Sequence, residues 1–380
     1  MQLNIAYIVH TLNPGGTERL ALDMAVHYST RGEEVYGRKY RVVIICLDEP
    51  GTWAELAKAQ GITVHCVRRR PGLDKGLPFR LAGIFRSEGI AIVHAHQYTP
   101  WFYSGLARLF CPGIKLIFQE HGRHYPEVDK PRRRWFNRLV LQHLNTVSTA
   151  VSEDIRQRLI DYEGLSGGHI RVIYNGTRPQ APCSDSERTE LRAEFGFGPE
   201  DLVVGTVGRL DPIKNLDLFI DGIYQIRQTQ PSVKGLIIGD GPEMGHLRAK
   251  TAYLKLQESI IFTGFRADAA DLVRMTDVFA LVSFSEGTSM ALLEAMASGV
   301  CPIVTDVGGN PEIVLDRETG WVVPSGDLTA FTAALKDAVL YQSMRQAFGK
   351  ASRDRFIERF DFGTMTDAYH RLYSEIAGRV

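Results

Sequence analysis

The chain has 380 residues, which is too many for one ordinary hydrophobic core and indicates two domains. Lysine and arginine together number 44, as do aspartate and glutamate, so no bulk charge attracts the chain to nucleic acid. Hydrophobic residues make up 44% and charged residues 23%, which is typical of a soluble globular protein.

The cysteines and the N-terminus indicate where the protein works. The chain has five cysteines without a Cys-x-x-Cys pair, and we expect buried thiols in a reducing cytosol. The N-terminus runs directly into an apolar strand without a basic segment before it, and no apolar run approaches about 18 residues. We therefore expect a cytoplasmic protein that is neither exported by a cleavable signal nor membrane-spanning.

The first half alternates between strands and helices. A strand at residues 5–9 is followed by a glycine turn containing Gly15 and Gly16 and by a helix start. The turn lacks the Gly-x-Gly-x-x-Gly spacing of a dinucleotide site, so an NAD site is not favoured. We expect a polar insertion at residues 31–39. Repeated strand and helix units predict a parallel sheet with helices on both faces. Further strands are expected at residues 41–47, 62–67, 90–96 and 115–120.

His121 follows the strand at residues 115–120. A histidine at the carboxyl end of a parallel strand faces the ligand crevice, although a structural role is the alternative. His94 and His96 alternate along a strand and point to one face, so the three histidines could form a zinc site. No third ligand has diagnostic spacing, which does not favour zinc.

Residues 130–141 form a basic, amphipathic helical segment, and no acidic residue occurs from Lys130 through Ser152. Arginines beside aromatic side chains on one helix suit an anionic membrane surface. A solvated face over the domain core and a site for an anionic acceptor are the alternatives. The patch consists of Arg132, Arg133, Arg134, Trp135 and Arg138.

A linker composition follows the strand expected at residues 170–174. Asn175 and Gly176, with the prolines and Ser-Asp-Ser after them, are typical of a turn and linker. We place the N-terminal domain at residues 1–178, a second domain at residues 179–360 and a last helix at residues 361–380.

The second domain repeats the alternation, and its first strand, residues 202–207, ends in a basic turn. Gly208 allows close approach of a ligand, and Arg209 and Lys214 place two cations at the strand end. These cations would neutralise a diphosphate, although a surface pair of bases is the alternative.

Residues 285–299 change character at Gly287, from an apolar strand to an amphipathic helix with Thr288 or Ser289 as N-cap. A helix that starts after a strand points N–H groups at the crevice, so we expect a phosphate there. Glu286 and Glu294 would repel phosphate, and their natural partners are the hydroxyls of a ribose or sugar ring. Two solvated surface charges are the alternative.

Three motifs in this half carry a family resemblance. They are the Glu-any-seven-Glu pair of Glu286 and Glu294, Ala-Met-Ala-Ser-Gly at residues 295–299 and Gly-Gly-Asn-Pro-Glu at residues 308–312. Together they resemble the donor-site signature of the retaining glycosyltransferases of family 4. The resemblance implies the GT-B fold, an α/β architecture with two Rossmann-like domains facing each other across a cleft. It also implies that the last helix crosses back to the N-terminal domain.

The resemblance implies catalytic roles for four residues. Arg209 and Lys214 would hold the leaving nucleoside diphosphate, Glu286 would contact the donor sugar's hydroxyls, and His121 would contact the same sugar. Glu294 would bind the ribose.

The resemblance also implies a wider donor site. Gly15 and Gly16 would lie over the donor and acceptor, and the backbone near Phe265 and Arg266 would meet the nucleobase. The family's glycine or proline and second glycine after the first glutamate are Thr288 and Ser289 here, which leaves the donor sugar open. The donor and diphosphate site would comprise Gly15, Gly16, Gly208, Gly287, Thr288, Ser289, Met290 and Ala291.

The expected reaction is transfer of a sugar from a nucleoside-diphosphate sugar, UDP favoured over GDP, to an acceptor hydroxyl. Retention of anomeric configuration follows from the resemblance. The sequence has no Asp-x-Asp triplet, so we expect metal independence and no cofactor. The basic patch favours a lipid-linked saccharide acceptor for surface polysaccharide or glycolipid synthesis, at the inner face of the cytoplasmic membrane. A nucleotide-sugar epimerase of the same fold and a non-catalytic nucleotide-sugar-binding subunit are the alternatives.

Overall fold

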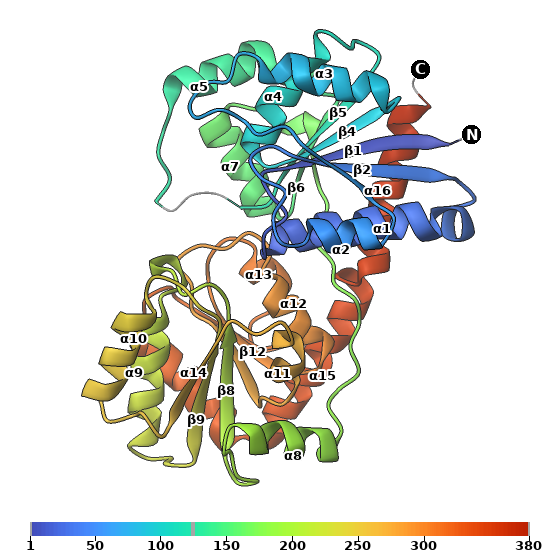
Figure 1. Cartoon of the computed structure of the whole chain (residues 1–380). Helices are drawn as coiled ribbons and strands as arrows, with labels where there is room; N and C mark the ends of the chain where they lie inside the picture. Colours follow the sequence, from blue (N-terminus) through green and yellow to red (C-terminus); the bar gives the residue numbers. More distant parts are fainter. Residues whose placement is uncertain (1, 123–125, 379–380) are drawn as a thin grey trace. The chain divides into compact units, whose positions relative to one another are not determined.

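The computed structural model describes residues 2–122 and 126–378, and the chain forms two compact units (Figure 1). Unit 1 comprises Met1–Asn175 and Met365–Val380, and unit 2 comprises Gly176–Thr364. From the sequence, these boundaries were expected at residues 178 and 361. Within the described ranges, no helix is long and apolar enough to cross a membrane.

Unit 1 is built on a parallel sheet. Its described residues form seven strands in the order β3-β2-β1-β4-β5-β6-β7, and each neighbouring pair is parallel. Such an order, which winds outward from β1 in both directions, is that of a Rossmann-like sheet. The strands are β1 (Leu3–Val9), β2 (Tyr40–Cys46), β3 (Thr63–Cys66), β4 (Ile92–His96), β5 (Lys115–Glu120), β6 (Val147–Ala150) and β7 (Ile170–Val172).

Helices connect these strands. They are α1 (Gly16–Tyr36), α2 (Ala54–Ala59), α3 (Leu77–Ser87), α4 (Tyr98–Arg108), α5 (Pro131–Phe136), the π-helical η1 (Asn137–Leu141), α6 (Gln142–Leu144), α7 (Glu153–Glu163) and the 3-10 turn η2 (Gly167–His169). The last helix of the chain is α16 (Phe362–Ala377), most of which belongs to unit 1. The insertion expected at residues 31–39 is wrong in its larger part, because residues 31–36 are the last turns of α1. Arg31 and Glu34 form an exposed ion pair on these turns, so the polarity reflects a solvated helix end.

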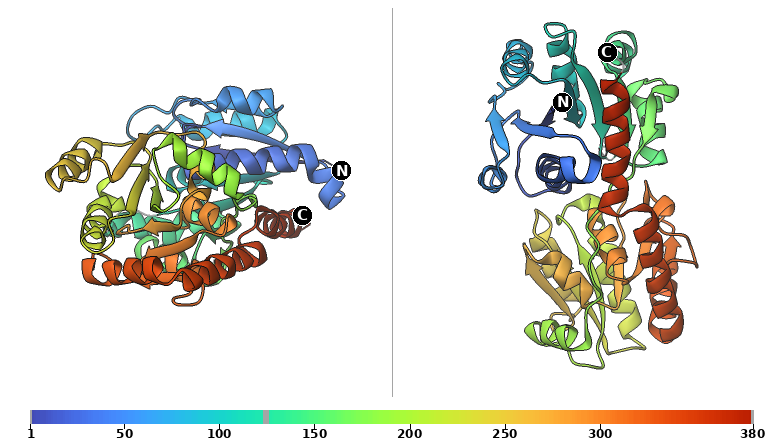
Figure 2. Two further views of the ribbon diagram at one scale, coloured as in Figure 1. Left: turned by 90° about the horizontal axis from the view of Figure 1, so that it is seen from below. Right: turned by 90° about the vertical axis from the view of Figure 1, so that its right-hand side faces the viewer.

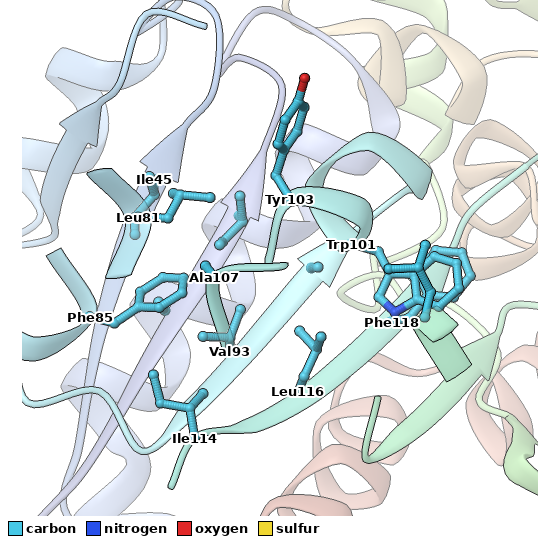
Figure 3. Packing of buried hydrophobic residues seen from close by; sticks show 14 of the residues in the cluster. Ile45, Leu81, Phe85, Val93, Trp101, Tyr103, Ala107, Ile114, Leu116 and Phe118 are labelled. Atoms are coloured by element: carbon cyan, nitrogen blue, oxygen red, sulfur yellow. The ribbon is translucent and has the colours of Figure 1, made fainter. Parts of the chain in front are cut away.

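One face of the unit 1 sheet packs against α3 and α4, whose buried side chains are shown in Figure 3, and against α7. The Trp101 ring of α4 stacks on Phe118 of β5 with 4.4 Å between ring centroids, and both side chains are fully buried. Parallel strands that are covered on both faces need continuous apolar sequence, and residues 116–118, Leu-Ile-Phe, satisfy this need.

The opposite face carries α16, which Figure 2 shows in red alongside the strands of unit 1. The Tyr28 hydroxyl of α1 donates to the Thr366 carbonyl at 2.6 Å, and the hydroxyls of Tyr7 and Tyr373 lie 3.0 Å apart. Buried tyrosines need such partners. The last helix therefore belongs to unit 1, as the fold class predicted.

Unit 2 is built on a second parallel sheet. Its strands lie in the order β10-β9-β8-β11-β12-β13. They are β8 (Leu202–Val207), β9 (Val233–Ile238), β10 (Ile260–Gly264), β11 (Val278–Leu281), β12 (Cys301–Thr305) and β13 (Trp321–Val323). The helices are α8 (Asp185–Glu194), η3 (Pro212–Lys214), α9 (Leu216–Arg227), α10 (Met244–Tyr253), α11 (Ala269–Arg274), α12 (Met290–Ala297), α13 (Asn310–Ile313), α14 (Leu328–Leu340) and α15 (Gln342–Arg359).

A buried charge network ties α8 to the amino edge of this sheet. Asp277, just before β11, accepts hydrogen bonds from Arg188, from Arg192 at 2.7 Å and from the Val203 amide at 2.8 Å. The Arg192 side chain is only 7% exposed and also donates to the Met275 carbonyl. This network fixes α8 to the sheet of unit 2, and removing one partner would leave an uncompensated buried charge.

We expect Asp277→Asn to lower the free energy of unfolding by about 3 to 5 kcal/mol, because buried Arg192 loses its counterion. Urea denaturation would measure the change. The control is Asp271→Asn, whose carboxylate is 53% exposed in its pair with Arg274 and should matter by less than about 1 kcal/mol. Equal effects of the two substitutions would contradict the assignment.

Candidate active site

The carboxyl edge of the unit 2 sheet holds a small pocket. It is lined in part by Gly208, Arg209, Lys214 and Ser283, which follow β8 and β11. Gly239, after β9, has φ of 136°, and a Cβ there would lie 1.9 Å from the Gly208 carbonyl oxygen. Glycine is thus required for this close approach of two strand ends. The pocket lies where ligands bind in open parallel sheets.

Lys214 and Glu286 meet at this pocket. Lys214 Nζ lies 2.6 Å from Glu286 Oε1, and the Ser283 hydroxyl donates to the same oxygen at 2.6 Å. The Lys214 side chain is 23% exposed and the Glu286 side chain 9%. The structure therefore brings together the cation expected for a diphosphate and the carboxylate expected for sugar hydroxyls.

The backbone around Glu286 is fixed by a glycine loop. Gly308 has φ of 55°, and a Cβ there would lie 1.8 Å from the Glu286 carbonyl oxygen. The Gly309 amide donates to the Gly287 carbonyl at 3.2 Å. The glycines at 308 and 309 thus hold the turn that leads into α12.

The start of α12 follows this turn. Ser289 is the N-cap, and its hydroxyl accepts from the Leu292 amide at 3.4 Å. Thr288 and Ser289 are buried, whereas Met290, Ala291 and Glu294 are partly exposed. A first helical turn offers backbone N–H groups and positive dipole charge to an anion, and Glu294 lies one turn after Met290.

Arg209 is the more exposed of the two expected cations. Its side chain is 73% exposed, and Nε lies 3.0 Å from Asp211 Oδ2. An exposed pair of this kind contributes little to stability, so the guanidinium can exchange Asp211 for another anion at small cost.

Phe265 and Arg266 follow β10, and they differ in how freely their side chains can contact a nucleobase. The Phe265 ring is 64% exposed. Arg266 donates to both carboxylate oxygens of Asp268, at 2.7 and 2.6 Å, and to Glu194 at 2.6 Å. The hydrogen bonds that Arg266 donates, first to Asp268 and then to Glu194, raise its pKa. The Arg266 side chain therefore serves unit 2 itself, and a nucleobase here would meet backbone or Phe265.

The glycine turn of unit 1 begins α1. Gly15 is the N-cap of α1, with extended backbone, and Gly16 is the first helical residue. The preceding Leu12 is held by the next loop, because its amide donates to the Pro50 carbonyl and its carbonyl accepts from the Trp53 amide. The turn thus has a fixed position within unit 1.

His121 ends a stack of three buried imidazoles in unit 1. Its Nε2 lies 2.9 Å from His96 Nδ1, and the His96 ring stacks between His121 and His94. Burial lowers the pKa of His94 and His121 to about 3 and the pKa of His96 well below its usual range. Stacked rings do not converge on a common point, and the described residues contain no group of three metal ligands.

The basic segment becomes α5 and η1. Arg132, Arg134, Trp135 and Arg138 are exposed. Arg133 is not: it pairs with buried Glu163, and its guanidinium carbon lies 3.4 Å from the centre of the Tyr98 ring. The pairing turns Arg133 inward. Its expected place in the exposed basic patch is therefore wrong.

Two residues of these sites were missed from the sequence: Ser283, which donates to Glu286, and Glu163, which accepts from Arg133. Neither carries a local signal, because their partners are distant in the sequence and meet them only on folding. His96 was named from the sequence as a possible zinc ligand with His121, and in the structure it contacts the His121 ring instead.

Comparison with known proteins now identifies the class. The model described as "Glycosyl transferases group 1" matches residues 187–355, and that described as "Glycosyltransferase Family 4" matches residues 14–181. The fold and these matches define a sugar-transferring enzyme. The chain belongs to the group 1 glycosyltransferases of family 4.

Individual relatives and solved structures match between about half and nearly all of the chain. N-acetyl-alpha-D-glucosaminyl L-malate synthase of Bacillus anthracis is 25% identical over 322 residues, 83% of this chain and 82% of that protein. The GDP-mannose-dependent alpha-(1-6)-phosphatidylinositol monomannoside mannosyltransferase of Mycolicibacterium smegmatis is 32% identical over 193 residues, 48% of this chain and 50% of that protein. Anabaena Alr3699/HepE, solved with UDP and glucose, shares the fold with a TM-score of 0.85 and 21% identity, over 98% of this chain and 100% of that one.

The buried histidines predict an acid-sensitive stability. Unfolded histidines bind protons below pH 6.5, whereas folded His94 and His121 stay neutral down to about pH 3. The free energy of unfolding should therefore fall as pH drops below 6.5, by up to about 1.4 kcal/mol per pH unit for each histidine. Urea denaturation between pH 7 and 4 measures this slope.

The slope should become shallower in His121→Asn. His143→Asn is the control, since His143 is exposed on α6 and its loss should leave the slope close to that of the wild type. An unchanged slope in His121→Asn would show that His121 is not buried in its neutral form.

Proposed function

We propose that the enzyme transfers a sugar, with retention and without a metal ion, from a nucleoside-diphosphate sugar to an acceptor hydroxyl. The observation that carries this proposal is the contact of Lys214 with Glu286 beside Gly208 and the start of α12. A diphosphate gives Lys214 a new counterion, and Glu286 Oε1 is then available to a sugar hydroxyl. One pair of side chains can thus bind both parts of the donor: Lys214 the diphosphate and Glu286 the sugar.

Leaving-group stabilisation is the main task in this reaction. As the anomeric bond breaks, negative charge grows on the diphosphate, and fixed positive groups lower the barrier. Arg209 and Lys214 supply two cations, and the N–H groups from Thr288 to Ala291 supply dipoles. These groups support transfer without a metal ion.

Retention of the anomeric configuration is proposed to result because the acceptor hydroxyl attacks the same face of the sugar from which the diphosphate departs. Glu286 is held by Lys214 and Ser283 and is assigned to the sugar's hydroxyls, with Glu294 at the ribose. The sugar therefore passes through a short-lived oxocarbenium ion pair, and the acceptor attacks within it. His121, at the end of β5, contacts the same sugar.

For the donor we favour a UDP-sugar. Anabaena Alr3699/HepE has been solved with UDP and with UDP-glucose, which supports UDP, whereas the mycobacterial relative is named for GDP-mannose. Thr288 and Ser289, buried beside Glu286, are proposed to select the sugar.

For the acceptor we favour a lipid-linked saccharide, reached at an anionic membrane surface inside the cell. Trp135 is 65% exposed and Leu139 50%, and Arg132, Arg134 and Arg138 are exposed on the same short segment. Apolar side chains can enter the headgroup region while arginines meet anionic lipids. The relatives include a lipopolysaccharide core mannosyltransferase of Rhizobium meliloti.

Donor binding provides the first test. In the presence of a chelator, UDP-sugars should raise the melting temperature, because a ligand that binds the folded state stabilises it. Lys214→Ala should weaken binding about 10- to 100-fold, since a hydrogen bond to a charged group contributes roughly 1.5 to 3 kcal/mol. Titration with UDP-glucose, UDP-N-acetylglucosamine and GDP-mannose measures the affinity.

Lys336→Ala is the matched control, because Lys336 is exposed on α14. Binding that requires a divalent metal ion, or that survives Lys214→Ala unchanged, would count against the proposed donor site.

Membrane contact is tested with vesicles. The protein should sediment with vesicles containing phosphatidylglycerol and not with pure phosphatidylcholine. Trp135→Ser with Arg138→Ser should reduce binding by about tenfold or more, because each basic residue near the surface contributes about 1 kcal/mol. Tyr253→Ser, which removes an aromatic ring that is 85% exposed on α10, is the control. Equal binding by both variants would contradict membrane contact through this segment.

A further inference from the structure

His96 contacts the ring of His121 and limits which of its nitrogens can meet a ligand. The two rings lie 5.2 Å apart between centroids at an interplanar angle of 21°, and the 2.9 Å contact joins His96 Nδ1 to His121 Nε2. Both side chains are buried. His121 therefore has Nδ1 as the ring nitrogen that can meet a ligand.

One proton lies between the two rings. Which histidine donates this proton decides whether Nδ1 of His121 is a hydrogen-bond donor or an acceptor. If His121 donated it, neutral His96 would carry its own proton on Nε2. That atom is buried and has no hydrogen-bond partner within the described part of the chain. A buried N–H without an acceptor is rarer and more costly than an unused lone pair. The favoured arrangement has His96 Nδ1–H donating to His121 Nε2.

We propose that His96 is a positioning residue that fixes His121 as its Nδ1–H tautomer, so that His121 presents an N–H donor to an oxygen of the donor sugar. The inference rests on the proposed contact between His121 and that sugar. A neutral imidazole has one donor and one acceptor nitrogen, and a bond to one nitrogen sets the role of the other.

The last helix supports this arrangement from the other end of the stack. His94 stacks on His96 with centroids 4.5 Å apart, and His94 Nδ1 lies 2.8 Å from the Tyr373 hydroxyl. Tyr373 is fully buried on α16 and also contacts the Tyr7 hydroxyl. A chain of contacts within unit 1 therefore runs from α16 through His94 and His96 to His121.

The direct test is the ring nitrogen spectrum of the wild type. Protein labelled with ¹⁵N-histidine gives long-range ¹H–¹⁵N correlations that distinguish the two neutral tautomers, and loss of signals in His121→Asn assigns them. We expect His121 in the Nδ1–H form. The Nε2–H form would overturn the proposal, whatever the activity of the enzyme.

The kinetic test compares two substitutions of His96. An asparagine amide can replace the Nδ1–H donor, whereas leucine cannot. Release of nucleoside diphosphate from UDP-glucose, UDP-N-acetylglucosamine or GDP-mannose, with water as acceptor, measures turnover without a known acceptor. His96→Leu should lower kcat about tenfold with KM for the donor within twofold, and His96→Asn should retain kcat within about threefold. Equal losses in the two variants would overturn the positioning role.

The two proposals fail separately. If the wild type neither binds nor hydrolyses these three donors, the proposed function fails, and the nitrogen spectrum still decides the tautomer. If His96→Leu does not fold, the spectrum of the wild type remains decisive. Mixed tautomers of His121 in the folded wild type would also overturn the proposal.

Discussion

Covering both faces of a parallel sheet with helices leaves the strand ends as the place for polar chemistry. In unit 2, Gly208, Lys214, Ser283 and Glu286 all follow strands at the carboxyl edge. In unit 1, His96 ends β4, and His121 follows β5. Everything assigned to the reaction depends on this constraint, because the two apolar faces of each sheet are already occupied by helices.

The surroundings of each ion pair distinguish cations that stabilise the fold from cations that are candidates for ligand binding. Arg192 and Arg133 are paired with carboxylates that are themselves largely buried, and Arg266 is bound by two acidic residues. Removing the carboxylate would leave the charge of Arg192 or Arg133 unpaired inside the protein, so these two arginines belong to the fold. Arg266 is held by hydrogen bonds to two carboxylates at once. Lys214 and Arg209 differ because both side chains line the pocket at the carboxyl edge of the sheet, where an anionic ligand can replace the one acidic partner of each.

Local patterns in the sequence predicted the strands. Contacts between residues that are distant in the sequence could not be predicted. The strands at residues 115–120 and 202–207 were predicted at the observed bounds, because apolar runs and turn residues are local signals. The contact between Lys214 and Glu286 joins residues 72 positions apart, and no local pattern encodes it. For the same reason Arg133 was taken as a surface cation, since its partner Glu163 lies 30 residues away.

If the proposed roles hold, the neutral imidazole stack gives unit 1 a different chemical task from unit 2. Burial holds the pKa of His121 at about 3, so near neutral pH its ring carries no positive charge and can offer only a hydrogen bond. In the proposed reaction, charge that develops on a leaving diphosphate is then met by the basic side chains of Arg209 and Lys214, which line the pocket of unit 2. The sugar contact proposed for unit 1 and the charge stabilisation proposed for unit 2 are therefore distinct tasks. A neutral donor beside a sugar does not compete with the two cations for the diphosphate, and for this reason burial of the histidine stack is compatible with catalysis.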